Sequence, residues 1–161
     1  MIDLKQMEAL VKKVLGKLGA KYATDDAVEL VMATGLVESR FKYLQQLNDG
    51  VAFSFWQIEP WVALDNCTNY LSYRPHIIQD CVDATKVVQA VWENGNEGDW
   101  RYLLHTNLAV GIVHCRLKYW RVPKRIPLST IRKAEYWKEF YNTEKGAGDP
   151  DDYVRLAGKY L

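Results

Sequence analysis

The chain has 161 residues, of which 48% are hydrophobic and 25% charged, and its formal net charge is +1. This composition is typical of a globular domain and excludes a disordered segment, while the near-neutral charge gives no reason to expect a nucleic-acid partner. No apolar run reaches transmembrane length, and the N-terminal MIDLKQMEALVKKVLGKLGA lacks the apolar core of a signal peptide, so we expect one domain over residues 1–161, made in the cytoplasm.

Two helices are predicted at the start of the chain. Apolar residues at helical spacing predict the first over residues 4–18. Thr24 or Asp25 can cap the second helix. Its inward stripe is formed by Ala27, Leu30, Val31 and Thr34 and continues through Glu38 to Phe41. An ionisable side chain therefore falls on the buried face of this helix.

Residues 43–58, with the sequence YLQQLNDGVAFSFWQI, differ from the predicted helices around them. An Asn-Asp-Gly turn lies between two short segments rich in aromatic and aliphatic residues, which is a strong β-hairpin signal. Further helices are expected near 60–70, 77–93, 99–120, 127–142 and 150–160, with prolines marking breaks or first turns. The predicted fold is mainly α, with one small β-hairpin inserted after the helix that carries Glu38.

The cysteines and histidines do not indicate a metal centre or a disulfide framework. Cys67, Cys81 and Cys115 are odd in number and lack paired CxxC spacing, so buried free thiols are expected. The three histidines show no ligand spacing. We expect no metal and no cofactor.

A run of basic residues occupies residues 116–138. Eight Lys or Arg stand here against the single acid Glu135. The simpler interpretation is a solvated helical face. The alternative is a patch that approaches anionic cell-wall polymers or bacterial membrane surfaces.

Glu38 is the residue whose position most needs an explanation. Burial disfavours the carboxylate form and raises the pKa of such a group. Glycoside cleavage requires a carboxylic acid that stays protonated near neutral pH, because the leaving oxygen must receive a proton. Taken alone, a Glu in the last turn of a helix is more often exposed or involved in a cap.

Four motifs in order along the chain strengthen the case for Glu38. They are Glu38-Ser39-Arg40-Phe41, Ser54-Phe55-Trp56-Gln57-Ile58-Glu59-Pro60, Asn107-Leu-Ala-Val-Gly111 and Phe140-Tyr141-Asn142-Thr143. The set resembles the soluble lytic transglycosylases and goose-type lysozymes, whose signature is Glu-Ser-x-Phe, a hairpin, Gly-Leu-Met-Gln-Ile, Asn-Ile-x-x-Gly and Ala-Tyr-Asn-Ala-Gly. Ser54, Phe55 and Trp56 depart from the family pattern, and the last motif lacks its final Gly.

The resemblance implies an α+β lysozyme-like fold and a role for each matching residue. Glu38 would be the general acid, and Gln57 would orient the substrate, since an amide can both donate and accept. Tyr141 and Asn142 would contact the sugar or hold Glu38 from across the cleft; the alternative for both is a capped helix C-terminus. Ser39 is expected to brace the helix end.

Several aromatic and polar residues near Glu38 are further candidates for substrate binding. Ser54 and Tyr43 belong to this group. Trp56 and Trp61 flank the proposed site and can stack on a pyranose ring, although core packing is the more common role of such residues.

Two reactions are compatible with this set of residues. A hydrolase that inverts needs a second carboxylate to activate water, whereas a transglycosylase uses the C6 hydroxyl of the sugar and one Glu as acid and then base. Glu59 follows Gln57-Ile58 and is the stronger candidate for the second carboxylate. Asp49 is the other candidate, but turn geometry also explains it. Hydrolysis is slightly favoured, and Pro60 favours transglycosylation.

The expected substrate is the peptidoglycan glycan strand. A catalytically inactive glycan-binding or structural protein and a chitinase-like enzyme are the alternatives. Without a signal peptide or a separate wall-binding module, the chain resembles bacteriophage lysis enzymes or virion-associated muramidases. The first kind would leave the host cytoplasm through a membrane-permeabilising, holin-type partner and act on the wall or in the periplasm, and the second would travel with the phage particle.

Overall fold

The computed structural model describes residues 2–161, and in them the chain is mainly helical. The helical segments are α1 Leu4–Leu18, η1 Ala20–Tyr22, α2 Asp25–Ser39, α3 Pro60–Asn69, η2 Leu71–Tyr73, α4 Pro75–Thr85, α5 Gln89–Asn94, α6 Glu97–Thr106, α7 Leu108–Trp120, α8 Thr130–Trp137, η3 Lys138–Asn142 and α9 Pro150–Tyr160. Segments η1 and η2 are short 3-10 turns, and η3 is π-helical.

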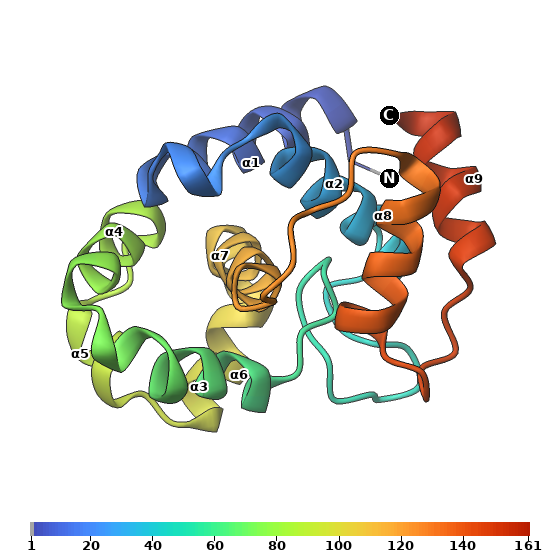
Figure 1. The fold of residues 1–161 in the computed structure, drawn as a ribbon. Helices are drawn as coiled ribbons and strands as arrows, with labels where there is room; N and C mark the ends of the chain where they lie inside the picture. Colours follow the sequence, from blue (N-terminus) through green and yellow to red (C-terminus); the bar gives the residue numbers. More distant parts are fainter. Residues whose placement is uncertain (1) are drawn as a thin grey trace.

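Helix α7 lies in the middle of the molecule. Figure 1 looks along it and shows α1, α4, α5, α3 and α6 around it, with α8 and α9 to one side. Residues 110–117 of α7 are all buried, which is the pattern of a helix covered on every face. Its sequence therefore has no polar face in this stretch, because α1, α2, α3, α4 and α6 all pack against it.

The first two helices agree with the sequence prediction. Asp3 caps α1, and its carboxylate accepts a hydrogen bond from the backbone N–H of Gln6. Of the two predicted caps of α2, Thr24 is the one used: its hydroxyl oxygen accepts from the N–H of Ala27. A side-chain oxygen here satisfies one of the N–H groups that the first turn leaves without a partner.

Two of the later predicted helices are wrong as single helices. The predicted helix 77–93 is divided into α4 and α5 at Lys86, which has φ 61° and is left-handed. The predicted helix 99–120 is divided into α6 and α7 at Asn107, whose backbone is extended. Asn107 caps α7 through Val110 N–H and also donates to the Thr85 carbonyl oxygen. The chain changes direction at these two breaks and packs around α7. Neither break is marked by a proline or a glycine in the sequence.

The predicted β-hairpin is wrong: no strand occurs in residues 2–161, and residues 43–58 form an irregular loop with two isolated bridges at Phe53. The predicted turn residues Asn48 and Asp49 do have positive φ. A ladder fails because Ser54 and Gln57 are also left-handed, with φ 64° and 48°. In addition, residues 52–56 are all buried in succession, whereas the side chains of a strand alternate between two faces.

The basic residues of 116–138 form neither a solvated face nor a continuous patch. Lys133 is buried and binds Asp26 and Glu29 at 2.9 and 2.8 Å, and Arg121 binds Asp65 at 2.6 Å. Arg116, Lys118 and Lys138 also make contacts within the fold and are described below. The exposed members are Lys124, Arg125 and Arg132.

The cysteines Cys67, Cys81 and Cys115 are buried and unpaired, as predicted. In the part of the chain that the structure describes, no helix has both the length and the apolar character needed to cross a membrane.

Candidate active site

Glu38 stands in the last turn of α2, and the way this helix ends determines where its side chain lies. Arg40 is left-handed with φ 54°, and its N–H bonds the carbonyl oxygens of Gly35 and Leu36. The Ser39 hydroxyl donates to the Gly35 carbonyl and accepts from Phe41 N–H. Phe41 then folds back over Gly35, where any Cβ would overlap its ring. Ser39 therefore braces the helix end, as predicted.

Glu38 lies in a cleft with a volume of about 590 Å³. Its lining includes Val37, Gln46, Ala52, Gln57, Ile58, Glu59, Trp61, Val62, Lys118, Trp137, Tyr141, Asn142, Thr143, Asp149 and Asp152. A second hollow of about 380 Å³ shares Val37, Glu38, Gln46 and Gln57 with the cleft and continues past Tyr43 and Leu47. Glu38 therefore faces space on both sides, along a groove.

The pKa of the Glu38 carboxyl is raised to about 7, and burial is the largest cause. Four groups oppose this rise by stabilising the carboxylate: hydrogen bonds from Trp137 and Asn142, and the charges of Lys118 and Lys138. The Trp137 indole donates to Glu38 Oε1 at 2.9 Å. Burial exceeds these effects, so Glu38 holds a proton up to near-neutral pH.

The π-helical segment η3 places Asn142 in the cleft, within reach of the Glu38 carboxyl. Asn142 Oδ1 accepts from the ammonium of Lys138 at 2.9 Å and from Gly148 N–H at 3.2 Å. With its oxygen occupied in this way, the amide nitrogen is the atom available to Glu38. The alternative of a simple capping Asn at a helix end does not describe this arrangement.

Tyr141 fixes the loop behind Glu38 to the end of α8. Its buried hydroxyl donates to the Trp56 carbonyl oxygen at 2.6 Å, and its ring stacks on Tyr119 with centroids 5.1 Å apart. The Tyr141 carbonyl oxygen accepts from Lys118 at 2.8 Å. Tyr141 lines the cleft, but its hydroxyl is used to hold the loop.

Gln57 lies beside Glu38 and lines both hollows. Its amide nitrogen donates to the carbonyl oxygens of Ser54 at 2.8 Å and Tyr43 at 3.2 Å. These bonds and the positive φ of Gln57 hold the side chain in one orientation, with no Gln57 Oε1 hydrogen bond to the rest of residues 2–161. This oxygen is the atom that Gln57 can offer to a ligand.

Ser54 and Trp56 are withdrawn from the predicted binding residues, because both side chains are fully buried. The Trp56 indole donates to the Val31 carbonyl oxygen at 2.8 Å, and the Ser54 hydroxyl accepts from Trp56 N–H at 3.2 Å. Both pack against Gly111 of α7, where a Cβ would be 2.8 Å from Ser54 Oγ. They support the loop that carries Gln57 instead of facing the groove.

The remaining predicted residues are divided between the groove and its surroundings. Glu59 and Trp61 line the cleft, and the Trp61 indole donates to the Glu59 carboxylate. Tyr43 lines the second hollow, with 42% of its surface exposed. Asp49 lies away from Glu38, in another hollow beside Arg101 and His105.

Trp137 and Lys118 are site residues that none of the sequence motifs includes. Trp137 precedes Tyr141 by about one helical turn, and Lys118 is seven residues after Gly111 on α7. Helical spacing could have placed both on the faces of the recognised motifs, since residues four or seven apart share a face. Asp149 and Asp152, which also line the cleft, carried no signal in the sequence.

Two further observations concern metal binding and the other large hollow of the surface. In residues 2–161, no group of three or more His, Cys, Asp or Glu side chains is placed to hold a metal ion. A larger hollow of about 710 Å³ lies between α1, α2 and α9; its lining mixes charged and apolar side chains and contains no residue of the Glu38 site.

Comparison of the chain with protein-family models, with curated proteins and with solved structures finds no match.

Proposed function

We propose that this protein is a lysozyme-like glycosidase that cuts the β-1,4 bond between N-acetylmuramic acid and N-acetylglucosamine in peptidoglycan. The observation that carries the proposal is Glu38, a partly buried carboxyl with a pKa of about 7 at the centre of a groove. The resemblance of its sequence motifs to the goose-type lysozymes and lytic transglycosylases supplies the substrate class.

In this proposal Glu38 donates its proton to the leaving glycosidic oxygen. Trp137 and Asn142 hold the carboxyl and stabilise the anion that remains after the transfer. Lys118 and Lys138 add positive charge nearby, which favours the same anion. The Gln57 oxygen can accept a hydrogen bond from a sugar hydroxyl or acetamido N–H.

The groove offers room for sugars on both sides of the bond that is cut. The two hollows meet at Glu38, and each has a partly exposed aromatic side chain: Trp61 in the larger and Tyr43 in the smaller. An exposed ring at each position can stack on a pyranose, as expected for a polymer that extends past the reacting bond.

Glu59 favours hydrolysis as the reaction, because it is a further carboxylate in the same cleft as Glu38. Asp149 and Asp152 also line this cleft, but only Glu59 directly follows the Gln57-Ile58 motif. It would activate water, while Trp61 orients its carboxylate. Asp49 is not part of this proposal, since it lines a different hollow. Transglycosylation, with Glu38 as acid and then base, is the alternative; it requires no second carboxylate.

The proposed partners follow from the substrate. The protein would act on peptidoglycan in the wall or periplasm, either after release through a membrane-permeabilising partner or as part of a phage particle.

The experiment is a turbidity assay on purified bacterial walls with three proteins: wild type, Glu38→Gln and Glu97→Gln. Glu97 is an exposed residue of α6 outside the groove and controls for the loss of one negative charge. We expect Glu38→Gln to lower the rate by about 10²–10⁴-fold, the usual contribution of a general acid, and Glu97→Gln to match wild type.

Product analysis distinguishes the two reactions. Reducing ends after digestion indicate hydrolysis, and anhydro ends, lighter by one water, indicate transglycosylation. If the protein cleaves chitin oligomers but leaves bacterial walls intact, its substrate is chitin and not peptidoglycan. If wild type and Glu38→Gln clear walls equally poorly but both bind them, the protein is a glycan-binding or structural one.

A further inference from the structure

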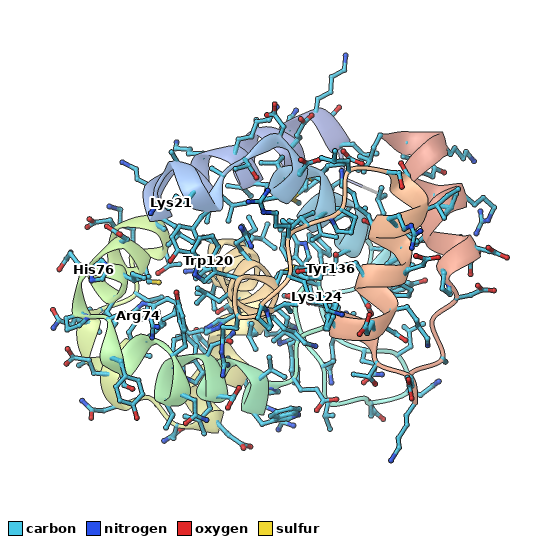
Figure 2. All side chains as sticks on the ribbon, in the orientation of Figure 1. Lys21, Arg74, His76, Trp120, Lys124 and Tyr136 are labelled. Atoms are coloured by element: carbon cyan, nitrogen blue, oxygen red, sulfur yellow. The ribbon has the colours of Figure 1, made fainter. Side chains whose placement is uncertain are left out.

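A separate cavity of about 530 Å³ lies where α7 ends and the chain continues toward α8. Its wall includes Arg116 and Trp120 of α7, Lys124 and Arg125 of the connecting segment, and Tyr136 of α8. Figure 2 shows Trp120, Lys124 and Tyr136 around this connecting segment. The cavity shares none of its lining residues with the Glu38 cleft.

Arg116 is the unusual residue of this cavity. Only 3% of its surface is exposed, and its Nε donates to the Tyr22 carbonyl oxygen at 2.9 Å. Its guanidinium carbon lies 5.2 Å from the centre of the Trp120 ring. Within residues 2–161, no carboxylate lies within 4.0 Å of Arg116, and its Nη atoms make no hydrogen bond. It is a buried cation without a counter-ion.

A second buried cation among the described residues, Lys133, shows the usual arrangement in this fold. Lys133 is 1% exposed, and its ammonium contacts two carboxylates, those of Asp26 and Glu29. Buried charges are usually paired in this way, because removing an ion from water is costly. Arg116 is buried to nearly the same degree, but it has no carboxylate partner, and it lines the cavity described above.

The rest of the cavity is positive as well. Lys124 and Arg125 are exposed residues of its lining, and the Tyr136 hydroxyl holds their segment by donating to the Lys124 carbonyl oxygen at 3.2 Å. Lys124 is 3.6 Å from Glu139, an exposed pair that contributes little in water. The one acid in the lining is Asp26, which Lys133 already neutralises.

We propose that this cavity binds a phosphate monoester through Arg116, Lys124 and Arg125. A planar guanidinium presents two N–H groups to two phosphate oxygens, and the two other cations favour a dianion over a carboxylate. The volume exceeds that of phosphate alone, and Trp120, Val122 and Ile126 provide apolar wall for an organic body. A soluble phosphate ester and a lipid headgroup share this chemistry.

The test is a titration of the full chain followed by NMR of the Trp120 indole N–H and the Arg116 Nε–H. The probes are inorganic phosphate, phenyl phosphate, and vesicles of phosphatidic acid, whose headgroup is a phosphate monoester, or of phosphatidylcholine, with sodium chloride at equal ionic strength as the control. We expect saturable shifts with phosphate and tighter binding of phenyl phosphate. Binding of only the anionic vesicles identifies a lipid headgroup as the source. Shifts that chloride reproduces, or that do not saturate with any probe, would overturn the proposal.

Variants connect the binding to the three cations. Arg116→Met should weaken the binding of phenyl phosphate at least about tenfold, as expected for a lost charge-assisted pair. The double variant Lys124→Gln/Arg125→Gln changes only exposed residues and keeps the test decisive if Arg116→Met does not fold. The matched control, Lys13→Gln/Lys17→Gln on the exposed face of α1, should bind as wild type does. Equal losses in the control and the double variant would show a nonspecific effect of charge and contradict the site.

Discussion

The Trp137 indole donates a hydrogen bond to Glu38 Oε1 across 2.9 Å, and it joins two residues, on α8 and α2, that are 99 positions apart in the chain. Only 1% of the Trp137 surface is exposed, so the packing around its ring fixes the indole, and the indole holds one oxygen of the carboxyl in place. The other neighbours of Glu38 also come from α7 and η3. The proposed acid therefore depends on contacts that only the assembled fold provides.

Glu38 should reduce the stability of the folded protein at high pH. Its pKa rises from 4.5 to about 7 on folding, so the folded state holds the proton that the unfolded state releases between these values. The contribution of Glu38 to the free energy of unfolding is fully present below pH 4.5 and is lost as pH rises through 7. Glu38→Gln removes this dependence, and its advantage over wild type should grow by about 3 kcal/mol across that range. Urea unfolding on either side of the range measures it, with Glu97→Gln as control. A constant difference between wild type and Glu38→Gln would contradict the raised pKa.

Trp137→Phe should change the pH dependence of the proposed activity. The variant loses the donor that stabilises the Glu38 carboxylate, so the pKa of Glu38 should rise further and the alkaline limb of the rate profile should move to higher pH. The maximum rate should fall roughly ten- to a hundredfold, because the carboxyl is no longer held in place.

Trp92→Phe is the matched control for this change. Trp92 is equally buried, but its indole N–H has no hydrogen-bond partner in the described residues. Both variants lose the same volume, and only Trp137→Phe should shift the profile. Identical profiles in the two variants would show that Trp137 acts through packing alone.

Gly111→Ala should destabilise the loop behind the site. A Cβ at this position would be 2.8 Å from Ser54 Oγ and 3.0 Å from the Trp56 ring. We expect a loss of about 1–3 kcal/mol, the usual cost of overpacking a core. Gly158→Ala in α9 is the control, because nothing lies within 4 Å of its added methyl. It should stabilise the helix by about 0.5–1 kcal/mol. Thermal and urea unfolding compare the two; a stabilised Gly111→Ala would show that the loop can move away.

His114 should make the protein sensitive to acid. It is fully buried in α7, its Nδ1 lies 3.2 Å from the Asn66 amide, and burial lowers its pKa from 6.5 to about 3. The unfolded chain binds a proton below pH 6.5 that the folded chain refuses, so stability falls as pH drops from 6.5 toward 3. The loss should reach about 2–3 kcal/mol midway through this range. His114→Gln should flatten the dependence, while the exposed His76→Gln should leave it unchanged. Equal acid sensitivity in all three proteins would place its origin elsewhere.

Local patterns in the sequence were enough to predict several elements. The apolar spacing of residues 4–18 and the cap at Thr24 gave α1 and α2, because these signals are satisfied within a few residues of the chain. The same stripe placed Glu38 on the inward face of α2. The divisions at Lys86 and Asn107 were not predicted. Asn107 is held by a bond to the Thr85 carbonyl oxygen, which is distant in the chain, and Lys86 takes a left-handed conformation that its residue type does not signal.

The loop 43–58 shows why local signals can mislead. Its turn at Asn48 and Asp49 was predicted, but the aromatic segment after it is buried by α2 and α7 and does not pair as a strand. For the same reason Trp56 is part of the core, whereas Trp61, in the first turn of α3, is exposed in the cleft. Adjacent side chains in an irregular loop have no fixed period, so the sequence alone does not say which of them face outward.

The sequence by itself determined the mainly helical fold, the inward position of Glu38 and the set of motifs that marks it as a candidate acid. The tertiary structure decided the rest: the raised pKa of Glu38, its bond from Trp137, the removal of Ser54 and Trp56 from the groove and the unpaired charge of Arg116. The physical reason is range. Helix spacing and caps are satisfied between residues three or four apart, whereas desolvation and charge pairing depend on groups that only folding brings together.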